Sequence, residues 1–268
     1  MSAITGTIRE HHRTAASMWG AGGRGYDDVS FAISDALGHA AQRLNPKPGQ
    51  AILDVATGTG WSARNAARKG ADVTAIDIAP ALLAAAKEIS APLPIAFKLA
   101  DAECLPFADA QFDGVISTFG VMFAVDQAQA AREMTRVCRP GGKLVMAVWV
   151  PEGAVVEFFG VLAKYGDAPP PSPSPMAWGD PGHATALLGD DFDLTFETGI
   201  SRAYHDDEDD IWNWYVRGFG PLRTLVDDLS PDRRAALKQD VDAYHSHYMT
   251  PAGLAIPREY RLILGTRR

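Results

Sequence analysis

The sequence predicts an α/β fold in which helices cover both faces of a mainly parallel sheet. Along the first 150 residues, short apolar runs alternate with amphipathic segments, and glycine- or proline-rich turns separate them. Parallel strands joined by crossover helices form sheets of this kind. Their ligands bind at the carboxyl ends of the strands, where the strand order reverses. The turns that follow the strands are therefore the expected place for a binding site.

The first predicted helix runs from Tyr26 to about Leu44, because apolar residues recur there at three- and four-residue spacing. The glycine-rich segment Trp19–Gly25 before it is predicted to be a mobile loop. The segment Asn45–Gly49 contains two prolines and a glycine, which end the helix.

Strand and helix signals then alternate. Helices are predicted at Trp61–Lys69, from Pro80 onward and along the face that includes Ala128 and Cys138. Five apolar runs are predicted strands: Ala51–Ala56, Asp72–Ile76, Ile95–Leu99, Phe112–Ser117 and Lys143–Val150.

The second part of the chain is less regular. The proline-rich stretch 168–175 is predicted to be a surface loop. Further strands are expected at Phe192–Ala203 and Glu259–Thr266. Helices are expected at Ala154–Tyr165, near Asp209–Leu229 and at Pro231–Tyr248.

Composition narrows the possible partners. Lys and Arg number 25 against 33 Asp and Glu, so the net charge is −8, and no basic patch stands out. A nucleic-acid partner is not expected, because an acidic surface repels phosphate. No apolar run approaches the roughly 18 residues of a membrane span. Two cysteines without metal-ligand spacing and a charged N-terminus predict a soluble, cytoplasmic protein without a metal site.

The turn after the first predicted strand reads LDVATGTG. Gly58 and Gly60 allow tight backbone turning and close approach of a ligand, and the following helix points its N-terminal amides at that ligand. Together with Ala63 these glycines also match a dinucleotide fingerprint. An NAD-dependent oxidoreductase is therefore an alternative at this point.

Two carboxylates follow the next two predicted strands. Asp77 lies nineteen residues after Gly58, where a carboxylate can accept hydrogen bonds from both ribose hydroxyls. The alternative is that it caps the helix containing Pro80. Asp101 can accept from an adenine amino group, or it can be a loop carboxylate in water.

Four segments in order resemble the successive motifs of class I S-adenosylmethionine-dependent methyltransferases: LDVATGTG, AIDIAP, LADAECLPFADAQFDGVIS and REMTRVCRPGGKLVMAVW. They are most similar to the ubiquinone/menaquinone-biosynthesis group, which carries the methyltransferase type 11 domain. The resemblance covers about Tyr26 to Trp149. It implies a Rossmann-like, seven-stranded sheet of order 3-2-1-4-5-7-6, with the last strand antiparallel and a helical cap near the C-terminus.

This resemblance implies one methyltransferase domain over 1–268, with a cofactor-binding core at 26–150 and the cap and acceptor-side elements within 151–257. Asp54 argues against the oxidoreductase, because dinucleotide folds usually carry an apolar residue inside that strand. Thr118 and the residues of the first motif would hold the methionine part of S-adenosyl-L-methionine. The implied cofactor contacts are Tyr26, Asp54, Ala56, Thr57, Gly58, Thr59, Gly60, Asp77, Ile78, Asp101, Ala102 and Thr118.

Methyl transfer needs neither a metal nor a catalytic triad, since the protein chiefly aligns the two reactants. A general base helps only when the acceptor must lose a proton. His205 is the first candidate for that base, and the alternative is a surface histidine. His11, His12 and His183 are expected to be solvated. The residues expected to approach the acceptor are Phe119, Met122, Phe123, Trp149 and Trp178.

Two cap features have competing explanations. The acidic run Asp206–Asp210 either binds a cation or, as favoured here, begins a helix whose dipole attracts negative charge. The aromatic cluster from Trp212 to Phe219 either walls an acceptor pocket or, as favoured, forms the core of the cap.

The expected function is methyl transfer to a small, aromatic or lipophilic acceptor. Three alternatives stay open: a non-catalytic protein that binds S-adenosylmethionine, a methyltransferase acting on macromolecules, and an NAD-dependent oxidoreductase. The sequence does not distinguish a monomer from a homodimer.

Overall fold

The computed structural model describes residues 6–167 and 169–268. Its strands are β1 (Ala51–Val55), β2 (Asp72–Asp77), β3 (Ile95–Leu99), β4 (Phe112–Thr118), β5 (Cys138–Trp149), β6 (Phe192–His205), β7 (Met249–Thr250) and β8 (Gly253–Arg267). Its α-helices are α1 (Arg13–Gly20), α2 (Tyr26–Phe31), α3 (Ser34–Leu44), α4 (Trp61–Ala67), α5 (Pro80–Ile89), α6 (Gln127–Val137), α7 (Ala154–Ala163), α8 (Pro181–Leu188), α9 (Glu208–Gly218), α10 (Gly220–Asp228) and α11 (Pro231–Ser246).

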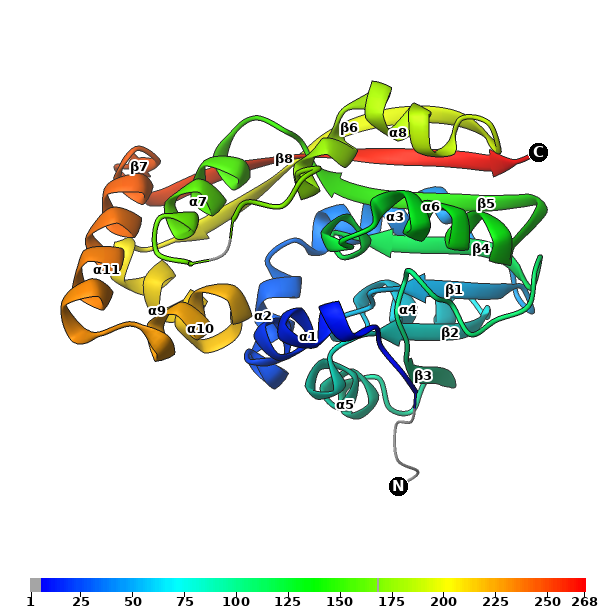
Figure 1. Cartoon of the computed structure of the whole chain (residues 1–268), viewed down its shortest axis with the longest axis horizontal. Coiled ribbons are helices and arrows are strands. Elements are labelled where there is room, and N and C mark those ends of the chain that lie inside the picture. Colours follow the sequence, from blue (N-terminus) through cyan, green and yellow to red (C-terminus); the bar gives the residue numbers. More distant parts are fainter. Residues whose placement is uncertain (1–5, 168) are drawn as a thin grey trace.

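The described strands form one sheet of order β3-β2-β1-β4-β5-β8-β6, and the two-residue β7 pairs with β8 outside this path (Figure 1). The strands from β3 to β5 are parallel, and β8 runs antiparallel to both β5 and β6. This confirms the predicted sheet order, because β8 takes the place of the predicted seventh strand. The short β7 changes only the numbering.

The strand order reverses beside β1, which lies between β2 and β4. The chain proceeds from β1 to β2 and β3 on one side, and then crosses to β4 and β5 on the other. The loops after β1 and β4 therefore diverge and leave a crevice at the carboxyl ends of these strands.

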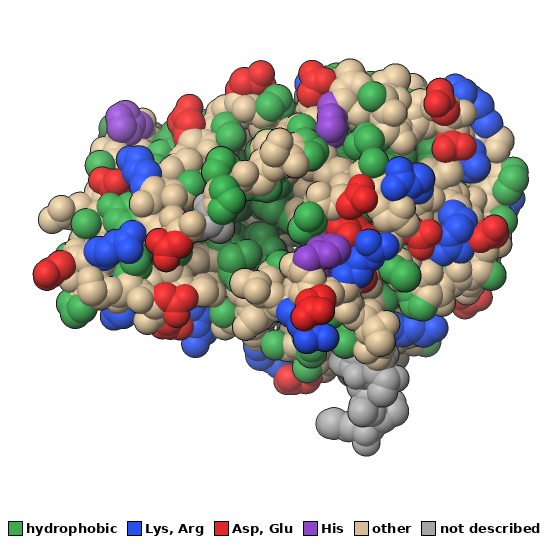
Figure 2. Space-filling model, viewed as in Figure 1, with side chains coloured by type: hydrophobic (Ala, Val, Ile, Leu, Met, Phe, Trp, Pro, Cys, Tyr) green, Lys and Arg blue, Asp and Glu red, His purple; other side chains and the backbone are tan. Residues whose placement is uncertain are grey.

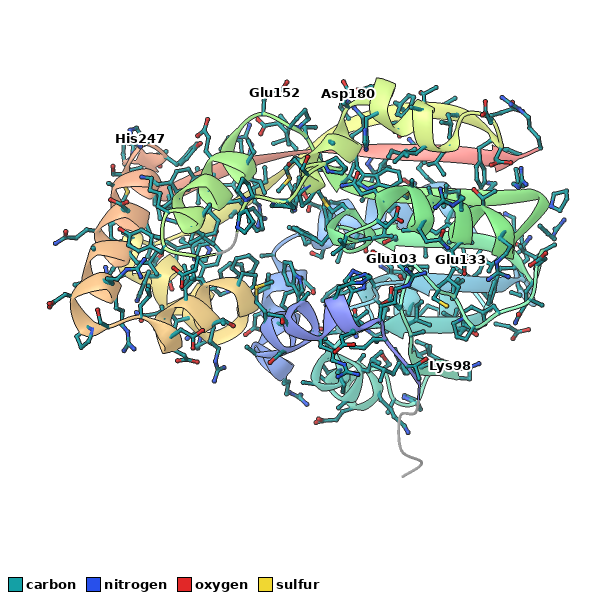
Figure 3. The ribbon with its side chains drawn as sticks, in the orientation of Figure 1. Lys98, Glu103, Glu133, Glu152, Asp180 and His247 are labelled. Carbon is teal, nitrogen blue, oxygen red and sulfur yellow. The ribbon has the colours of Figure 1, made fainter. Side chains whose placement is uncertain are left out.

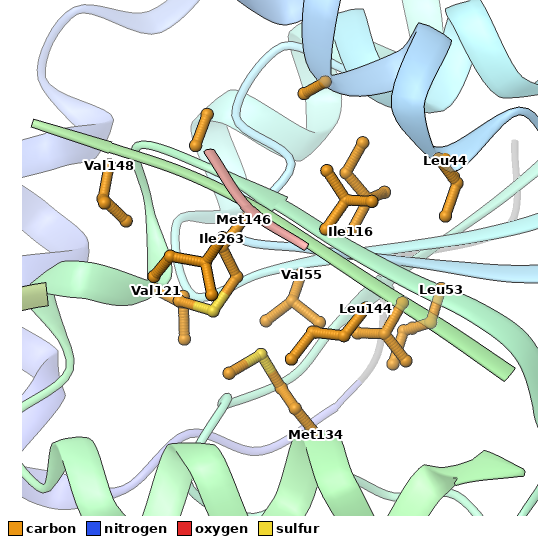
Figure 4. Packing of buried hydrophobic residues seen from close by; sticks show 14 of the residues in the cluster. Leu44, Leu53, Val55, Ile116, Val121, Met134, Leu144, Met146, Val148 and Ile263 are labelled. Carbon is orange, nitrogen blue, oxygen red and sulfur yellow. The ribbon is translucent and has the colours of Figure 1, made fainter. Parts of the chain in front are cut away.

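The central strands are mostly apolar because helices cover both faces of the sheet. Helices α3 and α4 pack together on the sheet, and α6 packs with α8. Met134 of α6 lies with Leu144 and Met146 of β5 and Ile263 of β8 in one fully buried cluster (Figure 4). The predicted strand Lys143–Val150 corresponds to the second half of β5, which is apolar because helices and β8 bury it.

Helices α7, α9, α10 and α11 gather at one end of the molecule, beside the extended ends of β6 and β8 (Figure 1). They enclose a second apolar cluster that includes Phe158, Phe219, Leu222 and Val241. The N-terminal helices join this cap to the sheet, since α1 packs on α10 and α2 packs on α9.

Several predicted boundaries were wrong. The helix expected from Tyr26 to Leu44 is broken between α2 and α3. The helix expected near Asp209–Leu229 is broken at Phe219, where Pro221 opens α10 and supplies no backbone N–H. Trp19–Gly25 is not an irregular loop, because α1 extends to Gly20 and a 3₁₀ turn follows at Gly23–Gly25.

The last strand is much longer than predicted. β8 begins at Gly253, and its first residues pair with the end of β6 as far as His205. Gly253 and Pro257 disfavour a strand when read locally, but β6 supplies the pairing that local preference lacks. Among the described residues, no helix is long and apolar enough to cross a membrane.

Candidate functional site

The turn after β1 is held in a conformation that side chains rarely permit. Gly58 and Gly60 have φ values of 56° and 88°, and Ala56 has φ 56° despite its Cβ atom. Phe119, just beyond β4, also has a positive φ of 56°. Such backbone costs about 1–3 kcal/mol per non-glycine residue and concentrates at functional sites. Ala56 and Phe119 stand at the two diverging loops, where the fold predicts a ligand crevice.

Asp77 ties this turn to the neighbouring strand. Its two carboxylate oxygens accept hydrogen bonds from the Gly58 amide at 2.8 Å and from the Ala79 amide at 2.9 Å. Burial raises its pKa, although the backbone donors oppose that shift. Asp77 is not the cap of α5, because Ala79 holds the N-cap position and no side chain caps the helix. It restrains the segment before α5 and also faces the crevice, where the ribose-binding prediction requires it.

Asp54 lies beneath the turn and is fully buried. Thr57 donates its hydroxyl to Asp54 Oδ2 at 2.6 Å, whereas Asp54 Oδ1 has no hydrogen-bond partner among the described residues. Burial raises the Asp54 pKa to about 7, against the opposing effect of the Thr57 hydrogen bond. A buried carboxylate oxygen without a donor is costly, so this atom calls for a water or a ligand group.

The crevice contains a cavity of about 940 Å³, its open mouth included, which we call the first cavity. Its lining comes from the carboxyl ends of β1, β2, β3 and β4 with the loops that follow them, and from the helices α1 to α5. Thr59 and Gly60 are buried behind the turn and, like Asp54, do not line it. The predicted cofactor contacts that line it are Tyr26, Ala56, Thr57, Gly58, Asp77, Ile78, Asp101, Ala102 and Thr118.

A second cavity, the aromatic cavity, lies between the sheet and the cap and encloses about 670 Å³ with its mouth. Most of its walls are aromatic, and Phe119 stacks on Trp149 with ring centroids 3.9 Å apart. Figure 2 shows a hollow with hydrophobic side chains in this region. The two cavities share the lining residues Trp19, Tyr26, Ile33, Phe119 and Phe123.

Some predicted acceptor-side residues lie elsewhere. Phe119, Phe123 and Trp149 line the aromatic cavity, but Met122 and Trp178 line neither cavity. Both are completely buried in the core, since Met122 follows β4 into the sheet packing and Trp178 packs beneath β5.

His205 also lines neither cavity. It is the last residue of β6, its Nδ1 lies 2.9 Å from Asp210 Oδ2, and its ring packs behind Trp214. The acidic run beside it begins α9, where Asp207 accepts a hydrogen bond from the Asp210 amide. His205 is therefore not placed to act on a ligand in either cavity, and with a side chain that is only 9% exposed it is not a solvated surface histidine.

The aromatic cluster of the cap lines a pocket and also forms part of the core of the cap, so both alternatives apply to it. Trp214, Tyr215 and Phe219 line the aromatic cavity, and Tyr215 and Phe219 also pack in the second apolar cluster. Trp212 packs against that cluster without lining the cavity. One set of side chains thus builds the cap and walls the cavity.

His12 was expected to be solvated, and that prediction was wrong. Its side chain is buried and lines the first cavity, with Nδ1 2.7 Å from Asp101 Oδ2 and Nε2 3.2 Å from Glu103 Oε1. Glu103 lies between the N-terminal segment and α6, where it also accepts from the Asp126 amide (Figure 3). The N-terminal segment around His12 is therefore held at the first cavity by the buried carboxylates of Asp101 and Glu103.

The pKa values of His12 and Asp101 shift in opposite directions. Burial opposes ionisation of Asp101, but hydrogen bonds from His12 and from the Arg9 and Glu103 amides outweigh it and lower the Asp101 pKa to about 2. Burial likewise acts to lower the His12 pKa, and Asp101 and Glu103 reverse that effect and raise it. His11 and His12 lie with Glu103 as potential metal ligands, yet Arg9 also sits 3.6 Å from Glu103.

The comparisons with known proteins agree with this geometry. Residues 53–146 match the model of the methyltransferase domain family. An uncharacterised protein of Mycobacterium tuberculosis is 35% identical over 210 residues, covering 75% of this chain and 76% of that protein. A demethylmenaquinone methyltransferase of Corynebacterium kroppenstedtii is 35% identical over 145 residues, covering 52% of this chain and 62% of that protein.

The chain belongs to the class I S-adenosylmethionine-dependent methyltransferases. A solved structure of this fold, the YcgJ protein of Bacillus subtilis, superposes with a TM-score of 0.63 at 18% identity, covering 87% of this chain and 98% of that one. The first three predicted motifs contribute residues to the first cavity, whereas the fourth reaches only the aromatic cavity, through Trp149. His12 and Arg258, which also line the cavities, lie outside those motifs.

The His12–Asp101 pair predicts a pH-dependent contribution to stability. The raised His12 pKa means that its contribution is complete below its unfolded value of 6.5 and is lost as the pH rises through the folded pKa. The lowered Asp101 pKa means that its contribution is present above 3.8 and is lost towards pH 2. His12→Leu should therefore cost about 1–3 kcal/mol of unfolding free energy between these limits and less at alkaline pH.

Urea unfolding of wild type and variant at pH 5.5 and pH 9 measures this difference. His11→Leu is the matched control, because its half-exposed pair with Glu103 is worth less than about 1 kcal/mol. A His12→Leu penalty that is the same at both pH values contradicts the prediction.

Proposed function

We propose that this chain transfers a methyl group from S-adenosylmethionine to a small aromatic acceptor, with the cofactor in the first cavity and the acceptor in the aromatic cavity. The observation that carries the proposal is the wall shared by the two cavities. Methyl transfer from a sulfonium is an in-line displacement, so donor and acceptor sites must adjoin. Phe119 and Tyr26 stand at that junction.

The residues of the first cavity suit S-adenosylmethionine. Asp77 offers carboxylate lone pairs to a ribose diol. Asp54 lies behind the turn and would act through Thr57, which lines the cavity and donates to its carboxylate. A Cβ atom at Gly58 would lie 3.3 Å from the Tyr26 ring, so glycine at this position leaves room for that ring beside the turn. Ile78 and Ala102 would flank adenine beside Asp101, whose fastening to His12 would close the cavity.

When bound, the cofactor supplies an electrophilic methyl group, and the electrons of the broken carbon–sulfur bond stay on sulfur. The chain supplies orientation and a dry environment. Stacked Phe119 and Trp149 fix the floor of the aromatic cavity, while Phe158 and Tyr215 stack with centroids 4.7 Å apart on the cap side. Flat apolar walls of this kind select a planar acceptor and exclude water.

The aromatic cavity offers no evident general base. Among the described residues that line it, the groups that titrate are tyrosines and one arginine. Burial raises the pKa of Tyr215 to about 12 and raises that of Tyr26 further. These phenols stay protonated at neutral pH and act as hydrogen-bond donors. An acceptor whose nucleophile is already unprotonated suits such a site.

A small-molecule acceptor is favoured over a macromolecule, because the aromatic cavity is enclosed between sheet and cap and its walls are apolar. Similarity to a demethylmenaquinone methyltransferase supports the same class of acceptor. A non-catalytic role in binding S-adenosylmethionine is the second candidate, because the tyrosines offer no base.

Asp77 gives the first test. S-adenosylhomocysteine should bind wild type and raise its Tm, whereas NADH should not, and Asp77→Asn should weaken the binding at least about tenfold because a charged acceptor is lost. Isothermal titration calorimetry measures the affinities. Asp72→Asn is the matched control, because Asp72 is exposed at the other end of the same strand. A Tm shift with NADH but not with S-adenosylhomocysteine contradicts the assignment.

Turnover gives the second test. Quinols, phenols, amines, thiols and aromatic acids should be screened with S-adenosylmethionine for release of S-adenosylhomocysteine. We expect turnover with a planar aromatic compound, reduced at least about tenfold by Phe119→Ala because the shared wall no longer aligns the reactants. Activity confined to protein or RNA refutes the small-molecule acceptor, and cofactor binding without any turnover favours the non-catalytic alternative.

A further inference from the structure

Arg258 introduces a positive charge into an otherwise apolar wall. It lies on β8 between Ile256 and Tyr260, on the strand face that also carries the buried side chains of Leu254 and Leu262. Arg258 and Ile256 both line the aromatic cavity. An apolar residue would complete this face, so a guanidinium there requires an explanation.

The partners of Arg258 within the chain are neutral. Nη2 donates to the Ala32 carbonyl and, at 3.3 Å, to the Ser201 hydroxyl, while Nε donates to the Ser201 carbonyl at 3.4 Å. Among the described residues, no carboxylate lies within ion-pair distance of it. Asp35 makes no direct contact with Arg258, because its carboxylate accepts from the Ser201 hydroxyl at 2.7 Å, but it attracts the guanidinium through space.

These contacts position the guanidinium but do not neutralise it. Nη1 donates to no described residue. Burial lowers the pKa of Arg258 although the nearby Asp35 carboxylate opposes that shift, so the cost of holding this charge away from water is not fully offset within the chain. A cation that faces a cavity and has no carboxylate in direct contact favours an anion inside that cavity, and a guanidinium binds planar oxyanions with particular strength.

We propose that Arg258 recognises an anionic oxygen group, a carboxylate or phenolate, on the aromatic acceptor. This inference rests on the proposed function and specifies its substrate class. The aromatic walls would hold the ring, and Arg258 would hold the oxyanion. Arg258 lines the aromatic cavity but not the first cavity, so the charged group would point away from the junction with the cofactor.

The described lining of the aromatic cavity carries no negative charge, which also suits an anionic ligand. Its tyrosines stay protonated, and the described lining contains no carboxylate that would repel an anion. A neutral aromatic compound of the same shape would contact the walls but leave Arg258 without a direct ion-pair partner. The chain should therefore prefer the anion to its neutral isostere.

Binding of matched probe pairs tests this preference. Benzoate with benzamide and 2-naphthoate with 2-naphthamide should be titrated calorimetrically into the S-adenosylhomocysteine complex of the full chain. We expect wild type to bind the anion at least about tenfold more tightly in one pair or both, the range of a charged hydrogen bond. Arg258→Met should remove that preference by weakening the anion while leaving the amide nearly unchanged.

Arg261→Met is the matched control, because Arg261 lies on the same strand, lines neither cavity and removes the same charge. It should keep the anion preference. Arg258→Gln provides a second variant should Arg258→Met fail to fold, since an amide can still donate to the Ala32 or Ser201 carbonyl. It too should lose the preference.

Equal binding of anion and amide by wild type in both pairs, or no binding of either, overturns the proposal. So does an anion preference that survives in Arg258→Met or Arg258→Gln. A structural role alone would lower the Tm and weaken both probes equally. S-adenosylhomocysteine binding separates the two hypotheses: its absence from wild type refutes the proposed function, whereas binding without an anion preference refutes only the role of Arg258.

Discussion

The carboxylate of Asp77 connects the two loops on which the first cavity depends. It accepts the Gly58 amide from the turn after β1 and the Ala79 amide from the entry to α5. The turn itself contains three residues with positive φ, so it needs such an external restraint. Because β1 and β2 are adjacent and parallel, their carboxyl ends bring these groups together. The sheet topology thus places the two loops side by side, and the buried Asp77 carboxylate holds them in the conformation that forms the first cavity.

The aromatic cavity depends on a different construction. Its walls come from α1, α2, the end of β4, β5, α7, α9, α11 and β8, which are spread over nearly the whole chain. The extended pairing of β6 with β8 carries Ile256 and Arg258 beyond the parallel core and towards the cap. The cap is therefore built around strands that belong to the central sheet, and the acceptor side is a direct continuation of the cofactor side.

The alternating apolar runs predicted a parallel α/β sheet, and the family resemblance implied the strand order and the motif residues that line the first cavity. Neither predicted the role of His12. Nothing within the segment around His12 indicates that Asp101 and Glu103, about ninety residues away, will surround it. The prediction that Trp178 and Met122 approach the acceptor was wrong for a related reason, because the size and apolarity of a side chain do not distinguish a cavity wall from the core.

Arg258 shows most clearly where sequence-based prediction ends. Pro257 and Gly253 hide the first part of β8, so the alternation that places Arg258 on a buried face cannot be recognised before the pairing with β6 is known. The same applies to the break between α2 and α3, where Arg258 binds the Ala32 carbonyl. Long-range contacts decide these features, and local preference does not encode them.

A crystal structure of the chain with S-adenosylhomocysteine tests the central claim most directly. The account predicts the ribose hydroxyls on the Asp77 carboxylate, adenine between Ile78 and Ala102, and the thioether sulfur directed past Phe119 into the aromatic cavity. A ligand bound outside the first cavity, or one whose sulfur points away from the aromatic cavity, would contradict it.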